Sequence, residues 1–136
     1  MSIYIKSLFF AIPTFIILIS IEMIFSKIKG ITRDICDQLD HKFLLQAKSN
    51  LLSSTLEQET WHLSFDNRVY QLPQSDVAVL AIENTTAELL AEWICHQIDK
   101  ELLHNKQANI TLITVEVEEM PGQSGGFQLE RSLIED

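Results

Sequence analysis

The chain has 136 residues, a net charge of −9 and 46% hydrophobic residues. This length allows one domain, and the hydrophobic fraction is too high for a disordered chain. The acidic balance argues against a nucleic-acid-binding protein, because binding phosphates requires clustered Lys and Arg. Cys36 and Cys95 lack the spacing of metal ligands, and both fall within helical patterns. We therefore predict two buried thiols in a reducing compartment, the cytoplasm.

Charge and hydropathy separate a short apolar head, residues 1–25, from an acidic domain, residues 26–136. Residues 7–25 form an apolar run close to the roughly 20 residues that a transmembrane helix needs. Pro13 and Glu22 oppose that interpretation, and no small-residue cleavage site for a signal peptide follows the run. The head is therefore either a membrane anchor or a pair of buried strands, because Ile and Phe also favour strands.

The first half of the acidic domain predicts one helix and three short strands. Residues 26–41 carry apolar side chains at steps of three and four, which is the spacing of a helix. Residues 46–59 are polar and are expected to form a loop. Residues 61–72 alternate around Asp66-Asn67, which predicts a hairpin, and residues 77–82 form a short buried strand.

The second half predicts a long helix followed by two strands. Apolar residues keep a helical period from Ala87 to Leu103, after a polar segment with N-cap side chains. Residues 110–119 form a strand in which Glu119 shares the inward face with two valines. Residues 121–126 are expected to form a loop, residues 127–129 a strand and residues 131–136 a solvated tail. The fold class is α+β, with the helices on one face of a mostly antiparallel sheet.

Two adjacent residues, Asp40 and His41, are a candidate acid/base pair, because a carboxylate beside an imidazole can orient it and raise its basicity. The alternative is a structural role, since a histidine near the last turn interacts well with the helix dipole. The other histidines, His62, His96 and His104, show no ligand grouping.

Three further side chains are candidate ligand-binding groups. Glu119 on an inward face needs a partner, such as a heterocycle edge with parallel N–H donors, unless the strand ends there in solvent. Thr86 and Glu88 fit the N-terminus of a helix, which is also a natural anion site.

Four stretches in order resemble motifs of the 6-pyruvoyl-tetrahydropterin synthase / 6-carboxytetrahydropterin synthase family. Residues 25–29, FSKIK, resemble the end of its "MVxDFxxLK" entry to the first helix. Residues 38–44, QLDHKFL, resemble "LDHxxLN", and residues 84–91, NTTAELLA, resemble "NPTAENLA". VEVEE at 115–119 and GGF at 125–127 resemble "VxVxET…AxY". The chain is thus similar to an N-terminally truncated or divergent member.

The resemblance implies the tunnelling fold, an antiparallel sheet with two helices on one face, and homo-oligomers with active sites at subunit interfaces. It implies a lyase that acts on 7,8-dihydroneopterin triphosphate in queuosine or tetrahydropterin biosynthesis. Asp40 and His41 would then be the catalytic pair, and Glu119, Thr86 and Glu88 would bind the pterin.

The resemblance also implies a zinc ion, held in the family by three histidines of its first two strands. Residues 1–25 contain no histidine and no cysteine, so we expect no metal site in this chain and an incomplete first hairpin in place of the head. Without zinc the chain would lack its Lewis acid, which makes catalysis by it alone doubtful. A non-catalytic pterin-binding or assembly subunit, or a membrane-anchored α+β domain, are the alternatives.

Overall fold

The computed structural model describes residues 26–106 and 109–132. The chain divides into two compact units, residues 1–34 and 35–136, and the site lies in the second. The predicted head, residues 1–25, lies outside the described residues, and so do both interpretations of it. No helix in the described ranges is long and apolar enough to cross a membrane.

The first described helix covers residues 26–39, as predicted. Ile35 on its apolar stripe is buried, whereas Cys36 is exposed. The prediction that both thiols are buried is therefore wrong for Cys36, because neighbouring residues of a helix point about 100° apart. Cys95 is buried as predicted, and desolvation, reinforced by the charge of Asp99, raises the pKa of its thiol.

Two short strands, β1 (Phe43–Gln46) and β5 (Val77–Leu80), pair in parallel. The strand β5 was predicted, but its partner β1 and the parallel direction were not. Leu45 and Leu80 are each only 1% exposed, so this pair contributes to the core.

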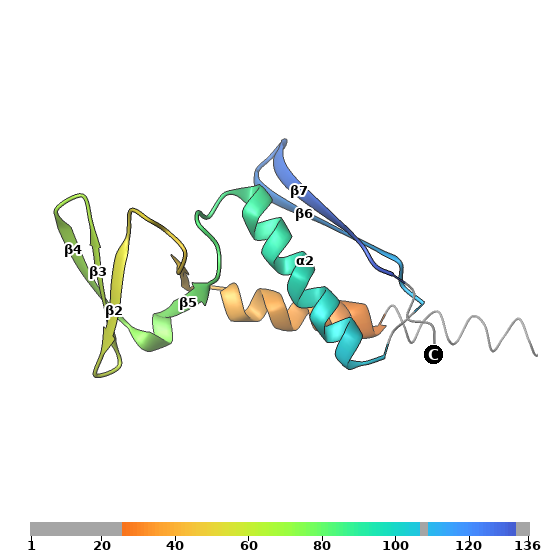
Figure 1. The fold of residues 1–136 in the computed structure, drawn as a ribbon, viewed down its shortest axis with the longest axis horizontal. Coiled ribbons are helices and arrows are strands. Elements are labelled where there is room, and N and C mark those ends of the chain that lie inside the picture. Colours follow the sequence, from red (N-terminus) through yellow and green to blue (C-terminus); the bar gives the residue numbers. More distant parts are fainter. Residues whose placement is uncertain (1–25, 107–108, 133–136) are drawn as a thin grey trace, which may run out of the picture. The chain divides into compact units, whose positions relative to one another are not determined.

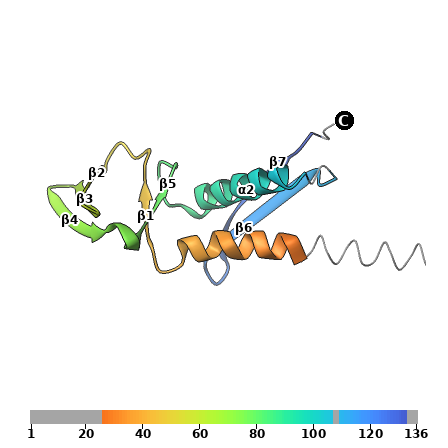
Figure 2. The ribbon, with the colours of Figure 1, turned by 90° about the horizontal axis from the view of Figure 1, so that it is seen from below.

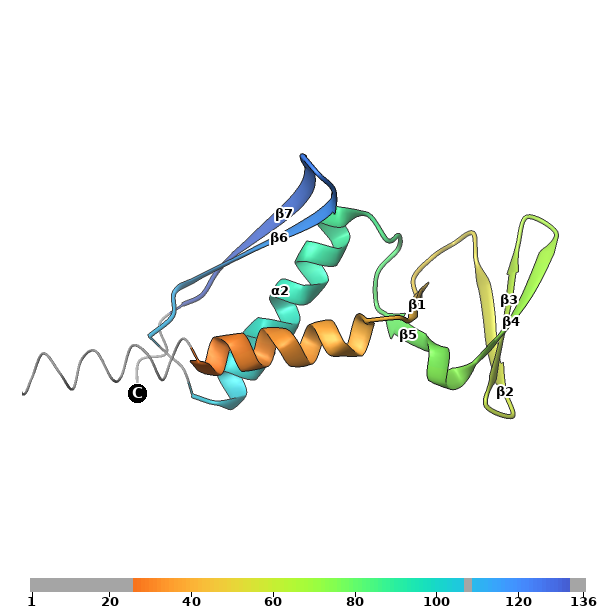
Figure 3. The same cartoon turned by 180° about the vertical axis from the view of Figure 1, so that it is seen from behind.

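A separate antiparallel sheet contains β2 (Ser53–Glu57), β3 (Thr60–Phe65) and β4 (Arg68–Pro73), in that order (Figure 3). The predicted hairpin is confirmed as β3–β4, and positive φ angles at Asp66 and Asn67 fit the tight turn between them. The predicted loop over residues 46–59 is wrong in part, because β2 lies within it and pairs with β3. A single 3-10 turn, η1 (Gln74–Asp76), connects β4 to β5.

The long helix α2 (Ala87–His104) packs against a hairpin made of β6 (Leu112–Met120) and β7 (Gln123–Glu130) (Figures 1 and 2). One stripe of α2 is buried, at steps of three and four residues: Ala87, Ala91, Cys95, Ile98 and Leu102. Ile113 on β6 is buried as well. This helix-on-hairpin layer confirms the predicted α+β class.

The C-terminal segment differs from its prediction in two places. The strand β7 begins at Gln123, so most of the loop predicted over residues 121–126 is strand. Arg131, placed in a solvated tail, is only 6% exposed at its side chain, and its Nε lies 2.6 Å from Oδ1 of Asp99 on α2. Its guanidinium also donates to the Ile110 carbonyl at 2.7 Å. Residues 133–136 lie outside the described residues.

Candidate functional site

A polar hollow of about 460 Å³ lies where the N-terminus of α2 meets the turn between β6 and β7. It is lined by two segments that are distant in the sequence: Thr86, Ala87 and Glu88 from the helix, and Glu119, Gly122, Gln123 and Ser124 from the hairpin. Three of the five predicted site residues, Thr86, Glu88 and Glu119, therefore share one cavity.

The helix side of the hollow is fixed by the capping of α2. The Thr86 hydroxyl accepts a hydrogen bond from the Leu89 amide at 3.3 Å, which makes Thr86 the N-cap. The Asn84 carboxamide oxygen accepts from the Thr85 amide at 2.9 Å and holds the preceding turn. Glu88 lies in the first helical turn, where the helix dipole stabilises its negative charge.

Gly125 brings the hairpin against the helix. A Cβ atom on this residue would lie 2.6 Å from the backbone nitrogen of Glu88 and 2.8 Å from the carbonyl carbon of Ala87. No side chain fits at those distances, because the obstructing atoms are backbone. The close approach of β7 to the first turn of α2 therefore depends on a glycine at this position.

The three glutamates of β6 have different environments. Glu116 accepts a hydrogen bond from the Ser124 hydroxyl, and Oε1 of Glu118 accepts from the Gly122 amide at 3.2 Å. The strand register shifts between Glu118 and Met120, so the regular alternation ends just before Glu119. Of the two positions expected for Glu119, inward with the valines or in solvent, the structure shows the second. Glu119 is exposed, and it lines the hollow.

The chemistry of the hollow follows from its side chains. Two carboxylates, Glu88 and Glu119, offer acceptors only, while Thr86, Gln123 and Ser124 both donate and accept. Such a set suits a small polar ligand that presents N–H donors to a carboxylate and further polar atoms to hydroxyl and amide groups. Gln123 and Ser124 were missed by the sequence analysis, which placed them in a loop without a role.

Asp40 and His41 lie at the end of the first described helix and do not line this hollow. The His41 Nε2 and Asp40 Oδ2 atoms are 3.6 Å apart, and the two side chains are 94% and 68% exposed. His41 has a φ of 55°, in the left-handed region that commonly ends a helix. Asp40 and His41 are next to each other and accessible to solvent, but neither is among the residues that line the hollow.

Among the described residues, the histidines are not grouped as metal ligands. All four lie among the described residues, and these contain no group of three His, Cys, Asp or Glu side chains suited to a metal ion. Nδ1 of His62 lies 3.3 Å from the Gln71 amide, and His96 stacks obliquely on Phe127. The residues described here therefore do not fit the three-histidine zinc site that the resemblance implies.

Comparison with known proteins gives concordant results. The sequence model of the family "6-pyruvoyl tetrahydropterin synthase" matches residues 19–129. A curated protein of Methanocaldococcus jannaschii, named "Putative 6-carboxy-5,6,7,8-tetrahydropterin synthase", is 35% identical over 104 residues. That match covers 76% of this chain, and the chain spans only 64% of the length of that relative.

Solved structures support the same assignment. The 6-pyruvoyltetrahydropterin synthase of Plasmodium vivax, in a variant of a catalytic residue, superposes with a TM-score of 0.72 at 26% identity. The match covers 79% of this chain and 68% of that one. The enzyme of Plasmodium falciparum, at 24% identity and a TM-score of 0.71, shares the fold over the same fractions. The fold is therefore the tunnelling fold, and the chain belongs to the 6-pyruvoyl tetrahydropterin synthase family.

Proposed function

We propose that the hollow at the N-terminus of α2 binds a pterin, and that the chain is a 6-pyruvoyl- or 6-carboxytetrahydropterin synthase-like lyase. Its substrate would be 7,8-dihydroneopterin triphosphate, in the cytoplasmic biosynthesis of tetrahydropterin or queuosine. The observation that carries this proposal is the convergence of Thr86, Glu88 and Glu119 on one cavity.

A pterin fits the donor and acceptor pattern of these residues. Its aminopyrimidinone edge carries parallel N–H groups, which pair with a carboxylate as a guanidinium does. Glu119 would accept from this edge, Glu88 would supply a second carboxylate, and Thr86 would contact the ring with its hydroxyl. Glu116 and Glu118 are engaged by Ser124 and Gly122, so Glu119 is the hairpin glutamate assigned to the ligand.

Isothermal titration with 7,8-dihydroneopterin tests this assignment. Glu119→Gln removes the charge but keeps the size of the side chain, and we expect affinity to fall about tenfold to a hundredfold, as for a lost charge-assisted hydrogen bond. The matched variant is Glu118→Gln, which keeps an acceptor for the Gly122 amide and should bind within about twofold of wild type. Equal losses in the two variants would refute the assignment of Glu119.

Asp40 and His41 are proposed as the acid/base pair, acting on a pterin bound by a neighbouring copy. Their exposure and their absence from the hollow of their own chain support a site shared across an oligomer interface. His41→Gly tests this role, because glycine adopts the left-handed φ of 55° without strain. We expect unchanged or slightly higher stability, unchanged pterin affinity, and turnover lower by about 100-fold or more. Unchanged turnover would leave His41 only a capping role.

A second candidate function is that of a pterin-binding or assembly subunit without catalysis. It is favoured by the poor fit between the described residues and a three-histidine zinc site. Atomic absorption on the purified protein distinguishes the two candidates. Substoichiometric zinc together with pterin binding would favour the second candidate, and one zinc per chain would contradict it.

A further inference from the structure

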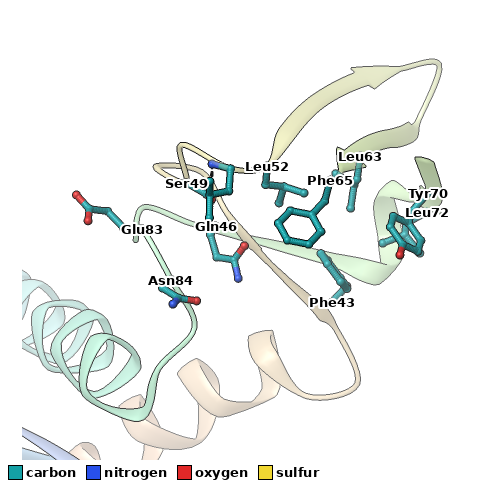
Figure 4. A pocket seen from close by; sticks show the side chains of 11 residues that line it. Phe43, Gln46, Ser49, Leu52, Leu63, Phe65, Tyr70, Leu72, Glu83 and Asn84 are labelled. Atoms are coloured by element: carbon teal, nitrogen blue, oxygen red, sulfur yellow. Dashed lines mark hydrogen bonds between the residues drawn. The ribbon is translucent and has the colours of Figure 1, made fainter. Parts of the chain in front are cut away.

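A second cavity, separate from the polar hollow, lies between β1 and the three-stranded sheet (Figure 4). Its volume is about 630 Å³, within the range of roughly 300–1,000 Å³ that is typical of small-molecule sites. It shares no lining residue with the hollow of Thr86, Glu88 and Glu119. An explanation of this cavity is therefore independent of the proposed pterin function.

The cavity has two chemically different ends. Figure 4 shows the aromatic rings of Phe43, Phe65 and Tyr70 gathered with leucine side chains at one end. The other end carries the polar side chains of Gln46, Ser49, Glu83 and Asn84. An apolar body with a few polar groups at one end is the usual lining of a site for a small amphipathic molecule.

The apolar end is unusually accessible for side chains of this kind. Phe43, Phe65 and Tyr70 are each 45–46% exposed. Of the apolar residues that line the cavity, only Leu63 is fully buried. Several aromatic side chains exposed side by side are costly in water. Such a group marks a binding site more often than a single exposed aromatic residue does. A flat ring packed against Phe43 and Phe65 would cover it.

The polar end selects the charge of the ligand. Glu83 is the one charged residue of the lining, and no ion pair is found for it among the described residues. Gln46 donates its amide to the Thr85 hydroxyl at 3.2 Å, which leaves its carbonyl oxygen to accept. The net charge of −9 further favours a cation near this surface.

We propose that this cavity binds a small aromatic amphiphile with a protonated amine, its ring among Phe43, Phe65 and Tyr70 and its ammonium group toward Glu83. The ring supplies the burial of apolar surface, and the ammonium group donates to the carboxylate and to the amide oxygens beside it.

Dansylcadaverine is a suitable fluorescent probe, because it joins a naphthalene ring to a primary amine. We expect saturable 1:1 binding to the full chain with a Kd on the order of 10 µM, the value typical of ligand efficiency at this size. The neutral N-pentyl dansylamide should bind about threefold more weakly, and an anionic naphthalene sulfonate more weakly still.

Two pairs of variants locate the probe. Phe65→Ser should weaken dansylcadaverine binding about tenfold, whereas Val69→Ser, on an exposed side chain of the same sheet outside this cavity, should leave it unchanged. Glu83→Gln should weaken the amine about threefold and leave the neutral probe unaffected. Phe65 and Glu83 are exposed, so neither substitution removes a core residue. Circular dichroism checks that each variant is folded, and 7,8-dihydroneopterin binding checks that the polar hollow is intact.

Three results would overturn the proposal. They are an absence of saturable binding, equal affinity in Phe65→Ser and wild type, and equal affinity for the amine and the anionic probe. Loss of binding as the protein self-associates would instead assign the cavity to a second copy of the chain, and would also overturn the proposal.

Discussion

The layer formed by α2 and the β6–β7 hairpin differs from the three-stranded sheet β2–β3–β4 in how its residues are buried. Five residues of α2, at steps of three and four, are buried, and so is Ile113 of β6. In the three-stranded sheet only Leu63 is fully buried, and every residue of β2 is exposed. The first region therefore has a core of its own, while the second depends on hydrogen bonds between strands.

This difference matches the kind of site in each region. Where α2 meets the hairpin, close backbone packing holds polar side chains at fixed positions around a small polar hollow. Beside the three-stranded sheet, accessible aromatic side chains surround a larger apolar cavity. Rigid elements position polar groups better than loops or open sheets do, which favours the first region for a chemically demanding ligand.

The largest expected effect concerns the partly buried ion pair that joins α2 to the residue after β7. Arg131→Met leaves the Asp99 carboxylate without its partner at 2.6 Å, and we expect the free energy of unfolding to fall by about 3 kcal/mol. The control is Arg68→Met at the exposed start of β4, where we expect less than about 0.5 kcal/mol. Urea unfolding measures the free energy of unfolding of both variants. Similar decreases in the two variants would mean that the two regions depend equally on their arginines.

A smaller loss is expected where β7 crosses the first turn of α2. Gly125→Ala places a methyl group against backbone atoms of Ala87 and Glu88, and should cost about 2 kcal/mol. Gly126→Ala is the matched control, because its nearest contact is the Val115 carbonyl at an ordinary 3.6 Å. Pterin affinity should fall with the first variant alone, since the hollow shares these backbone atoms. Equal stability of the two variants would show that the helix and hairpin are not in close contact.

Sequence patterns predicted the elements that bury a regular face and missed those that depend on distant contacts. The period of α2 and the alternation of β6 were visible because their apolar residues face one core. The strand β2 was missed because its five residues are all exposed and only pairing with β3 makes it a strand. Arg131 was placed in solvent because no local pattern indicates a partner on α2.

The candidate site was predictable to a similar extent. The motif at residues 84–91 and the end of β6 supplied Thr86, Glu88 and Glu119, and the structure brings these three together. The register shift before Glu119 was not visible, because a bulge has no signature in a period-two pattern. Gln123 and Ser124 were missed because a segment rich in glycine was interpreted as a loop, whereas Gly125 serves close packing.

Amide chemical shifts of the ¹⁵N-labelled protein, titrated with 7,8-dihydroneopterin, would locate the pterin directly. We expect the largest shifts at residues 86–89 and 119–124, and none in β2, β3 and β4. Shifts centred instead on Phe43, Phe65 and Tyr70 would place the pterin in the apolar cavity and contradict the assignment of the hollow at α2.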